Sequence, residues 1–241
     1  MSRKATKVYV VTAPESIRGV YDSWSACETA VSGVSGARYQ SVGTRREAEA
    51  ILRGETTFLP VGTYAFIDGN HLGGIGVVFV QQELQRRVVK EISTSAVEVF
   101  SEKRIAMLDS PVAIAEALSR IGNVLAELGG LSRALEQVAQ GTTLTVVHDF
   151  EGVGAWLEGR WKARDPIVAA VVSDCRAVIS RRGLSVMFRH QQGHQSTFAA
   201  RNDFARFNAR ADALARQAGQ QPRESVYSEP IGIPEPAAKI R

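Results

Sequence analysis

The chain has 241 residues, of which 44% are hydrophobic and 22% are charged, and its formal net charge is +4. This length suffices for one large domain or two small ones, and the composition is typical of a soluble globular protein. Its two cysteines, Cys27 and Cys175, lack CxxC spacing, which argues against a disulfide framework and for a reducing compartment. Neither a signal peptide nor an apolar run of the roughly 18 residues of a membrane span is recognisable. We therefore expect a cytoplasmic protein with no membrane partner.

The excess positive charge lies in the first fifth of the chain. Residues 1–53 contain 8 Lys or Arg against 5 Asp or Glu, whereas residues 54–218 contain 18 against 17. A small cationic module attracts polyanions, although a charge of this size is weak support by itself.

The first fifty residues have the pattern of a small β/α domain. Ser23 precedes a helical stretch as an N-cap, and Thr44 with Glu47 gives a capping-box pattern. We predict a compact ββαβα domain over residues 1–53, followed by a linker over residues 54–62. Its elements are expected at residues 7–11, 19–23, 23–31, 37–42 and 44–52.

Residues 63–218 have the pattern of a larger α/β domain. An apolar run from Thr63 to Ile67 ends at Asp68, and Ser110-Pro111 marks the start of a helical stretch that is interrupted at Gly122 and at Gly129-Gly130. Alternation of strands and helices after this point predicts a mixed sheet. The other strands are expected at residues 76–79, 90–100, 142–149 and 184–190, and the other helices at residues 151–179 and 204–218.

The remaining segment, residues 219–241, is rich in Pro, Gln and Glu and has no periodicity. Such a composition does not bury enough apolar surface to offset the entropy of ordering. We predict a disordered tail.

Four carboxylates lie just past a strand end or where a residue facing the core belongs. Asp68 and Asp149 end strands, Glu127 lies beside the apolar stripe of its helix, and Asp212 lies on the closing helix. Singly, each has an ordinary explanation as a turn former, a solvated helix residue or, for Asp212, a partner of Arg216. The order of the four along the chain is what points to a shared site.

Two further residues have a similar setting. His194 lies in a Gly-flanked loop before the last helix, where it is either an exposed loop residue or a proton carrier. Glu116 lies on the same helical stretch as Glu127 and remains an alternative to it as the second carboxylate.

This order resembles ribonuclease H type 1, in the bacterial subgroup that carries an N-terminal hybrid-binding, viroplasmin-like domain. "YAFIDGN" is similar to the family's first strand, "NVLAEL" to its Glu helix, and "VVHDFEGVGAWLEGRWKA" to its third acidic stretch. "NARADALARQA" is similar to the final motif, and the "GH" at 193–194 to the histidine of the mobile loop. "KVYVV", "GVYDSWSACETAVSGVSGARY" and "TRREAEAIL" resemble the hybrid-binding domain in order and spacing.

The resemblance implies a ribonuclease H-like mixed five-stranded sheet with helices on both faces, preceded by the ββαβα domain. It also implies that Asp68, Glu127, Asp149 and Asp212 are catalytic and bind metal, with His194 as a helper in proton transfer or product release. Four clustered carboxylates carry about −4 and repel one another, and divalent cations remove that cost.

The expected cofactor is a pair of Mg²⁺ ions, for which Mn²⁺ can substitute, because oxygen ligands without a nearby cysteine favour these ions. Two ions about 3.5–4 Å apart can activate a water and stabilise the leaving 3′ oxygen of a phosphodiester.

Contacts to nucleic acid follow from the same resemblance. Gly69 and Asn70 are candidates for the RNA strand, whose 2′-hydroxyl distinguishes it from DNA. Trp161 and Lys162 either hold the backbone of the DNA strand or belong to the core and to a solvated face. In the hybrid-binding domain the candidates for stacking and phosphate contacts are Tyr9, Trp24, Arg38 and Tyr39.

One departure from the family lies in this domain. Relatives place a basic pair after the aromatic residue of the third strand, whereas this chain has Gln40 and Ser41. Since each lost phosphate contact reduces the salt dependence of binding, we expect weaker hybrid binding than in the basic relatives.

The expected activity is that of a monomeric endonuclease that hydrolyses the RNA strand of RNA–DNA hybrids and leaves 3′-hydroxyl and 5′-phosphate ends. Two alternatives stay open. One is a non-catalytic hybrid-binding protein, against which the four retained acids argue. The other is a different nuclease on the same fold, such as a DNA recombination enzyme, which the hybrid-binding module disfavours.

Overall fold

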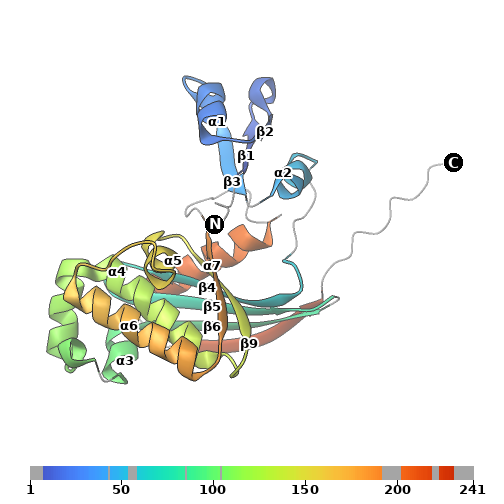
Figure 1. Cartoon of the computed structure of the whole chain (residues 1–241). Coiled ribbons are helices and arrows are strands. Elements are labelled where there is room, and N and C mark those ends of the chain that lie inside the picture. Colours follow the sequence, from blue (N-terminus) through green and yellow to red (C-terminus); the bar gives the residue numbers. More distant parts are fainter. Residues whose placement is uncertain are drawn as a thin grey trace. The chain divides into compact units, whose positions relative to one another are not determined.

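The computed structural model describes residues 8–42, 44–53, 59–84, 86–103, 105–191, 202–218 and 223–230. The chain divides into two compact units, Met1–Phe58 with His194–Arg206 and Leu59–Gly193 with Phe207–Arg241, and Figure 1 labels most of their elements. Within the described residues, no helix has the length and apolar character required to cross a membrane.

The N-terminal domain is built on a three-stranded antiparallel sheet in the order β2-β1-β3. Ser23 caps the first helix as predicted, because its Oγ accepts a hydrogen bond from the backbone N of Ala26 at 3.2 Å. The side chain of Glu47, the other half of the predicted capping box at Thr44, lies outside the described residues. The ββαβα order is confirmed: β1 (Val8–Ala13), a 3₁₀ turn (Glu15–Ile17), β2 (Gly19–Tyr21), α1 (Trp24–Val31), β3 (Arg38–Val42) and α2 (Arg45–Leu52).

The second unit contains a six-stranded mixed sheet in the order β8-β7-β4-β5-β6-β9. Strands β4 (Gly62–Gly69), β5 (Gly74–Gln82) and β6 (Arg86–Ser95) form an antiparallel meander. Strand β7 (Thr143–His148) runs parallel to β4, and β8 (Ser185–His190) runs parallel to β7. The predicted mixed α/β class is confirmed, although the sheet has one strand more than the five expected.

The sixth strand, β9 (Arg223–Pro230), comes from the segment for which the composition predicts disorder. It pairs antiparallel with β6, from Arg86 opposite Pro230 to Ser93 opposite Arg223. Pairing with β6 satisfies the main-chain donors and acceptors of both strands along an otherwise open sheet edge. The amino-acid composition of the segment gives no information about this stabilisation by pairing. The prediction of disorder is therefore wrong for residues 223–230.

Helices cover both faces of this sheet, as Figure 1 shows. On one face, Ile67 and Ile75 pack in a core with α3 (Ala96–Ser101), α4 (Pro111–Gln137) and α6 (Pro166–Arg181), and α5 (Gly152–Leu157) adds Val153 to it. On the other face lies α7 (Asp203–Gln217), where the ring of Phe207 is 5.4 Å from that of Phe66. Ile67 and Phe66 are neighbours in β4 and point to opposite faces, because side chains alternate along a strand.

Helix α3 occupies residues that the pattern assigned to a strand extending to residue 100. Ser95 starts the helix by accepting a hydrogen bond from the backbone N of Glu98 at 3.2 Å, and the Oε2 atom of Glu98 accepts one from the N of Ser95 at 3.0 Å. This capping box is visible in the sequence as Ser-x-x-Glu, and it overrides the β-branched residues around it.

Helix α4 continues through Gly129 and Gly130, where an interruption was expected. A side chain at Gly129 would overlap with Ile75, so the glycine allows close packing of α4 on β5. The expected interruption near Gly122 is present as a kink, with Ile121 at φ −133° and ψ 32°.

The helix expected over residues 151–179 is two helices, α5 and α6. Gly159 adopts a positive φ of 75°, which ends the first helix, and the carboxylate of Asp165 caps the second by accepting from the N of Ile167 at 2.8 Å.

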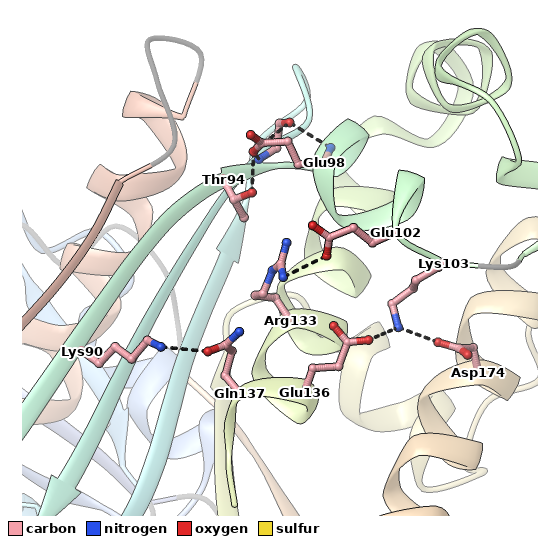
Figure 2. Close-up of polar contacts among 10 residues, drawn as sticks. Lys90, Thr94, Glu98, Glu102, Lys103, Arg133, Glu136, Gln137 and Asp174 are labelled. Carbon is pink, nitrogen blue, oxygen red and sulfur yellow. Dashed lines mark hydrogen bonds and ion pairs between the residues drawn. The ribbon is translucent and has the colours of Figure 1, made fainter.

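A buried lysine joins the helices on the first face (Figure 2). Lys103 follows α3, and its side chain is 7% exposed. It contacts Glu136 of α4 at 2.7 Å and Asp174 of α6 at 2.9 Å. A buried ammonium is costly unless it is paired, so loss of Glu136 or Asp174 would leave an uncompensated charge between α4, the helix that carries Glu127, and α6.

Candidate active site at the end of the central strands

Asp68 and Glu127 meet where β4 ends. A side chain at Gly69 would overlap with backbone atoms of Ala126 and Glu127, so this glycine lets the backbone of α4 lie directly on the strand. The Oε1 atom of Glu127 then accepts a hydrogen bond from the N of Gly69 at 3.2 Å. Asp68 is 8% exposed and Glu127 is 3% exposed, whereas Glu116 lies exposed on the first half of α4. The geometry favours Glu127 as the second carboxylate.

Asp149 reaches the same end of the sheet through strand register. Strand β7 is parallel to β4, with Phe66 opposite Val147, so two further residues along the chain place Asp149 level with Asp68. The carboxyl ends of adjacent parallel strands meet at one edge of a sheet.

Asp212 reaches this end through close packing of α7. Side chains at Gly74 and Gly76 would overlap with the carbonyl oxygens of Ala215 and Ala211, so both glycines admit the helix backbone to β5. Gly76 is the register partner of Asp68. The turn of α7 that carries Asp212 therefore lies over the strand next to Asp68.

The pKa values of two of these acids report their mutual proximity. Burial, followed by the charges of Asp149 and Asp212, raises the pKa of Asp68 from an ordinary 3.8 to about 8. Burial, followed by the charges of Asp68 and Asp149, raises the pKa of Glu127 well above its ordinary value. Like charges in a poorly solvated setting disfavour ionisation. The four acids thus form one electrostatic group.

This group has the chemistry of a cation site. Its donors are carboxylate oxygens, which hard divalent cations prefer, and the Oε2 atom of Glu127 is buried without a hydrogen-bond partner. In the part of the chain that the structure describes, no three His, Cys, Asp or Glu side chains are placed so that they would hold a metal ion. Asp212 is instead paired with Arg216 one turn later, so ion binding would require it to leave that partner.

A second candidate surface lies in the N-terminal domain. Three aromatic rings from β1, α1 and β3 form a row, with 5.5 Å between the centroids of Tyr9 and Trp24 and 5.6 Å between those of Trp24 and Tyr39. Trp24 is 40% exposed and Tyr39 is 41% exposed, and Arg38, which precedes Tyr39 in β3, is also exposed. Exposed rings of this kind are suited to stacking on nucleic acid bases.

Residues 7–52, which contain this aromatic row, match the family model described as the ribonuclease H1 N-terminal domain. The match shows the family of this N-terminal domain and covers residues 7–52 only. The chain is also similar to the solved structure of LC11-RNase H1, which was isolated from compost by a metagenomic approach. The identity is 17%, the alignment covers 65% of this chain and 92% of that chain, and the TM-score is 0.37.

The histidine that the ribonuclease H resemblance implies, His194, lies outside the described residues. Two other histidines, which sequence reasoning missed, lie beside Asp149. The Nε2 atom of His190 donates a hydrogen bond to the backbone O of Asp149 at 2.7 Å, and His190 is the register partner of His148. Burial, followed by the charge of His190, lowers the pKa of His148 to about 4, so His148 is neutral. Their placement at the ends of two predicted strands was the available signal.

The two residues expected to contact RNA in a ribonuclease H are used inside the chain. The side chain of Asn70 accepts hydrogen bonds from the N of Leu72 at 2.9 Å and from the N of Gly74 at 3.0 Å. Its Nδ2 donates to the O of Ala215 at 2.7 Å, which ties the β4–β5 turn to α7. The N of Gly69 donates to Glu127. Their contact with RNA stays a prediction.

The two tryptophans after Asp149 have different settings. Trp156 packs against the core, with its ring 5.6 Å from that of Phe150. Trp161 is 46% exposed and, with Lys162, lines a cavity of about 400 Å³ beside α6. Trp161 and Lys162 are therefore available to a ligand, and Trp156 both packs against the core and lines the same cavity.

Proposed function

We propose that the chain is a metal-dependent endonuclease that hydrolyses the RNA strand of RNA–DNA hybrids and leaves 3′-hydroxyl and 5′-phosphate ends. One observation carries the proposal. At one end of the central strands, buried Asp68 lies within electrostatic reach of Asp149 and Asp212, and buried Glu127 within reach of Asp68 and Asp149. Such a group is costly unless cations or protons neutralise it, and the match of residues 7–52 indicates which chemistry the cations serve.

Asp68, Glu127, Asp149 and Asp212 would hold two ions, Mg²⁺ or Mn²⁺. Bound there, two ions supply activation of a water and stabilisation of the leaving 3′ oxygen. The protein residues do the rest. Glu127 is fixed by its hydrogen bond to Gly69, and Asp149 is fixed through its backbone by His190, so that both acids are oriented before a substrate arrives.

Recognition of the hybrid is divided between the two units. In the N-terminal domain, Trp24 and Tyr39 offer stacking surfaces that tolerate any base sequence. In the second unit, Trp161 and Lys162 offer an aromatic face and a cation to the backbone of the DNA strand. The RNA strand would lie along the β4–β5 turn, beside the acids that act on it, where its 2′-hydroxyl distinguishes it from DNA.

A specific observation favours the alternative of a hybrid-binding protein without turnover. Asp212 is paired with Arg216, and this ion pair competes with a metal for the same carboxylate. Its cost is small, because Arg216 is 58% exposed and surface ion pairs contribute about 0–1 kcal/mol. A divalent cation held by several carboxylates outweighs it, and therefore we retain the enzyme.

The test is cleavage of a hybrid with separately labelled strands in Mg²⁺. The wild type should cut the RNA strand only, and Asp68→Asn and Glu127→Gln should lose roughly a hundredfold or more in rate, because several kcal/mol of charge stabilisation disappear. Glu116→Gln is the matched control, since it lies exposed on the same helix, and should cut like the wild type. Equal cutting by wild type and Asp68→Asn contradicts the site, and binding of the hybrid without cutting indicates the non-catalytic alternative.

A further inference from the structure

Glu91, on β6, is a buried carboxylate that joins three elements of the second unit. It is 5% exposed, and Arg210 of α7 donates to it from Nε at 2.9 Å and from Nη2 at 2.6 Å. Two side chains of β9 also donate, Ser225 from Oγ at 3.4 Å and Tyr227 from Oη at 3.2 Å. A buried carboxylate is stable only when it is paired and hydrogen-bonded, and here a helix and a strand share that role.

The C-terminal half of α7 is held to the sheet at further points. The last four carbonyls of a helix have no partner within the helix. Two of them accept from sheet residues: the O of Leu214 from Ser93 Oγ at 2.9 Å, and the O of Ala215 from Asn70 Nδ2 at 2.7 Å. These contacts fix how far α7 lies along the sheet.

The contact between Glu91 and Arg210 fixes a different coordinate, the rotation of α7 about its axis. With 3.6 residues per turn, residues two positions apart point about 200° away from each other. Arg210 points toward β6 and β9, and Asp212 points to the opposite side of the helix, where its charge acts on Asp68. A rotation that releases Arg210 from Glu91 therefore changes the direction in which Asp212 points relative to the other acids.

We propose that β9 is a positioning element of the active site: Ser225 and Tyr227 hold Glu91 in place, Glu91 holds Arg210, and the rotation of α7 that results directs Asp212 toward Asp68. The inference rests on the proposed function, in which Asp212 binds metal. Glu91, Ser225 and Tyr227 lie on the side of α7 away from Asp212 and act on the reaction only through Arg210. The C-terminal segment is thus part of the catalytic unit rather than only a cover for the open edge of β6.

The test uses the full-length chain with the double substitution Ser225→Ala and Tyr227→Phe, which removes both hydrogen bonds to Glu91 and keeps the strand. Three quantities are measured: hydrogen exchange of residues 207–217, Mn²⁺ affinity by calorimetry, and kcat and KM for a hybrid. We expect faster exchange in α7 and a loss of about three- to tenfold in Mn²⁺ affinity and in kcat, with KM unchanged, because two modest hydrogen bonds are lost.

Val226→Thr is the matched control, because Val226 is 62% exposed on the other face of β9, and it should match the wild type in all three quantities. Ser225→Thr, which keeps the hydroxyl, should do so as well. A double variant that melts at lower temperature but equals the control in α7 exchange, Mn²⁺ affinity and kcat overturns the inference and leaves β9 as edge cover.

The outcomes separate this inference from the proposed function. If the wild type binds Mn²⁺ but does not cut a hybrid, the proposed function fails, while exchange and Mn²⁺ affinity still decide the role of β9. If the wild type neither binds Mn²⁺ nor cuts, both proposals fail together.

Discussion

Asp68 is buried next to three other acids. Its pKa of about 8 means that it keeps its proton in the folded chain up to about that pH. Below that pH the folded chain holds a proton that the unfolded chain releases near pH 4. Since the folded state then binds more protons than the unfolded state, stability falls as pH rises through this window. A divalent cation takes the place of the proton, so metal binding and pH act on the same group.

The decrease of stability with rising pH gives a prediction for thermal unfolding. In EDTA, the melting temperature should decrease between about pH 4 and about pH 8, because native Asp68 keeps its proton over this range. Mg²⁺ should raise the melting temperature more at about pH 8.5 than at about pH 6. Asp68→Asn is the control and should show a smaller effect of Mg²⁺ at both values. A Mg²⁺ effect that is larger at the lower pH would contradict the assignment.

At the scale of elements, three glycines place the helices that carry the acids. Gly69 admits the backbone of α4 to β4, and Gly74 and Gly76 admit that of α7 to β5. Each acid on a helix therefore depends on a strand residue that has no side chain. Helix backbones otherwise lie further from a sheet, because side chains separate the two.

Gly76→Ala should separate Asp212 from Asp68. The new methyl group would overlap with the O of Ala211, so α7 must move, at a cost of about 1–3 kcal/mol of stability. We expect hybrid cleavage to fall by more than the loss of folded protein explains, when activity is normalised to the folded fraction measured by circular dichroism. Gly19→Ala is the control, because an added Cβ there meets nothing closer than 3.8 Å. Full activity per folded molecule in Gly76→Ala would show that the position of α7 is not critical.

Most elements could be predicted from the sequence, because hydrophobic periodicity and capping residues are local signals. The strand that ends at Asp68 and the helix that begins at Pro111 follow from such patterns. The helix at Ala96–Ser101 had a local signal as well, the capping box of Ser95 and Glu98, but the β-branched residues around it favoured a strand.

The remaining differences depend on contacts distant in sequence. Strand β9 forms because β6 offers an open edge, which the composition of residues 223–230 does not report. In the candidate site, the four acids could be identified from the sequence by their residue type and by their order along the chain. The pairing of Asp212 with Arg216 was one of the ordinary explanations and is present, and the roles of His148 and His190 arise only when β7 and β8 become neighbours.

At the scale of the whole molecule, the proposed function assigns separate tasks to the two units. Part of the positive charge of the N-terminal domain is neutralised internally, since Arg45 contacts Asp22 at 2.7 Å and Glu49 at 3.3 Å, and Arg18 contacts Glu15 at 3.5 Å. We therefore expect the exposed aromatic row to contribute more to hybrid binding than the charges do. The sequence-based expectation of weaker hybrid binding than in the basic relatives stays a prediction.

Hybrid binding by the full-length Asp68→Asn variant should accordingly depend only weakly on salt. We expect a slope of log K against log salt that corresponds to about one or two phosphate contacts for the N-terminal domain. Trp24→Ala should weaken binding by roughly fivefold or more whatever the sequence, because stacking contributes about 1–3 kcal/mol per base. Fluorescence anisotropy at several salt concentrations measures both quantities. A steep salt slope with no effect of Trp24→Ala would indicate that phosphate contacts dominate.

The central claim is that four acids from two strands and two helices act as one cation site. A crystal grown in Mn²⁺, with the ions located by anomalous scattering, tests it most directly. We expect two Mn²⁺ ions bound by Asp68, Glu127, Asp149 and Asp212, with Asp212 released from Arg216. A crystal in which Mn²⁺ is absent from this site, or in which these side chains point away from one another, would contradict it.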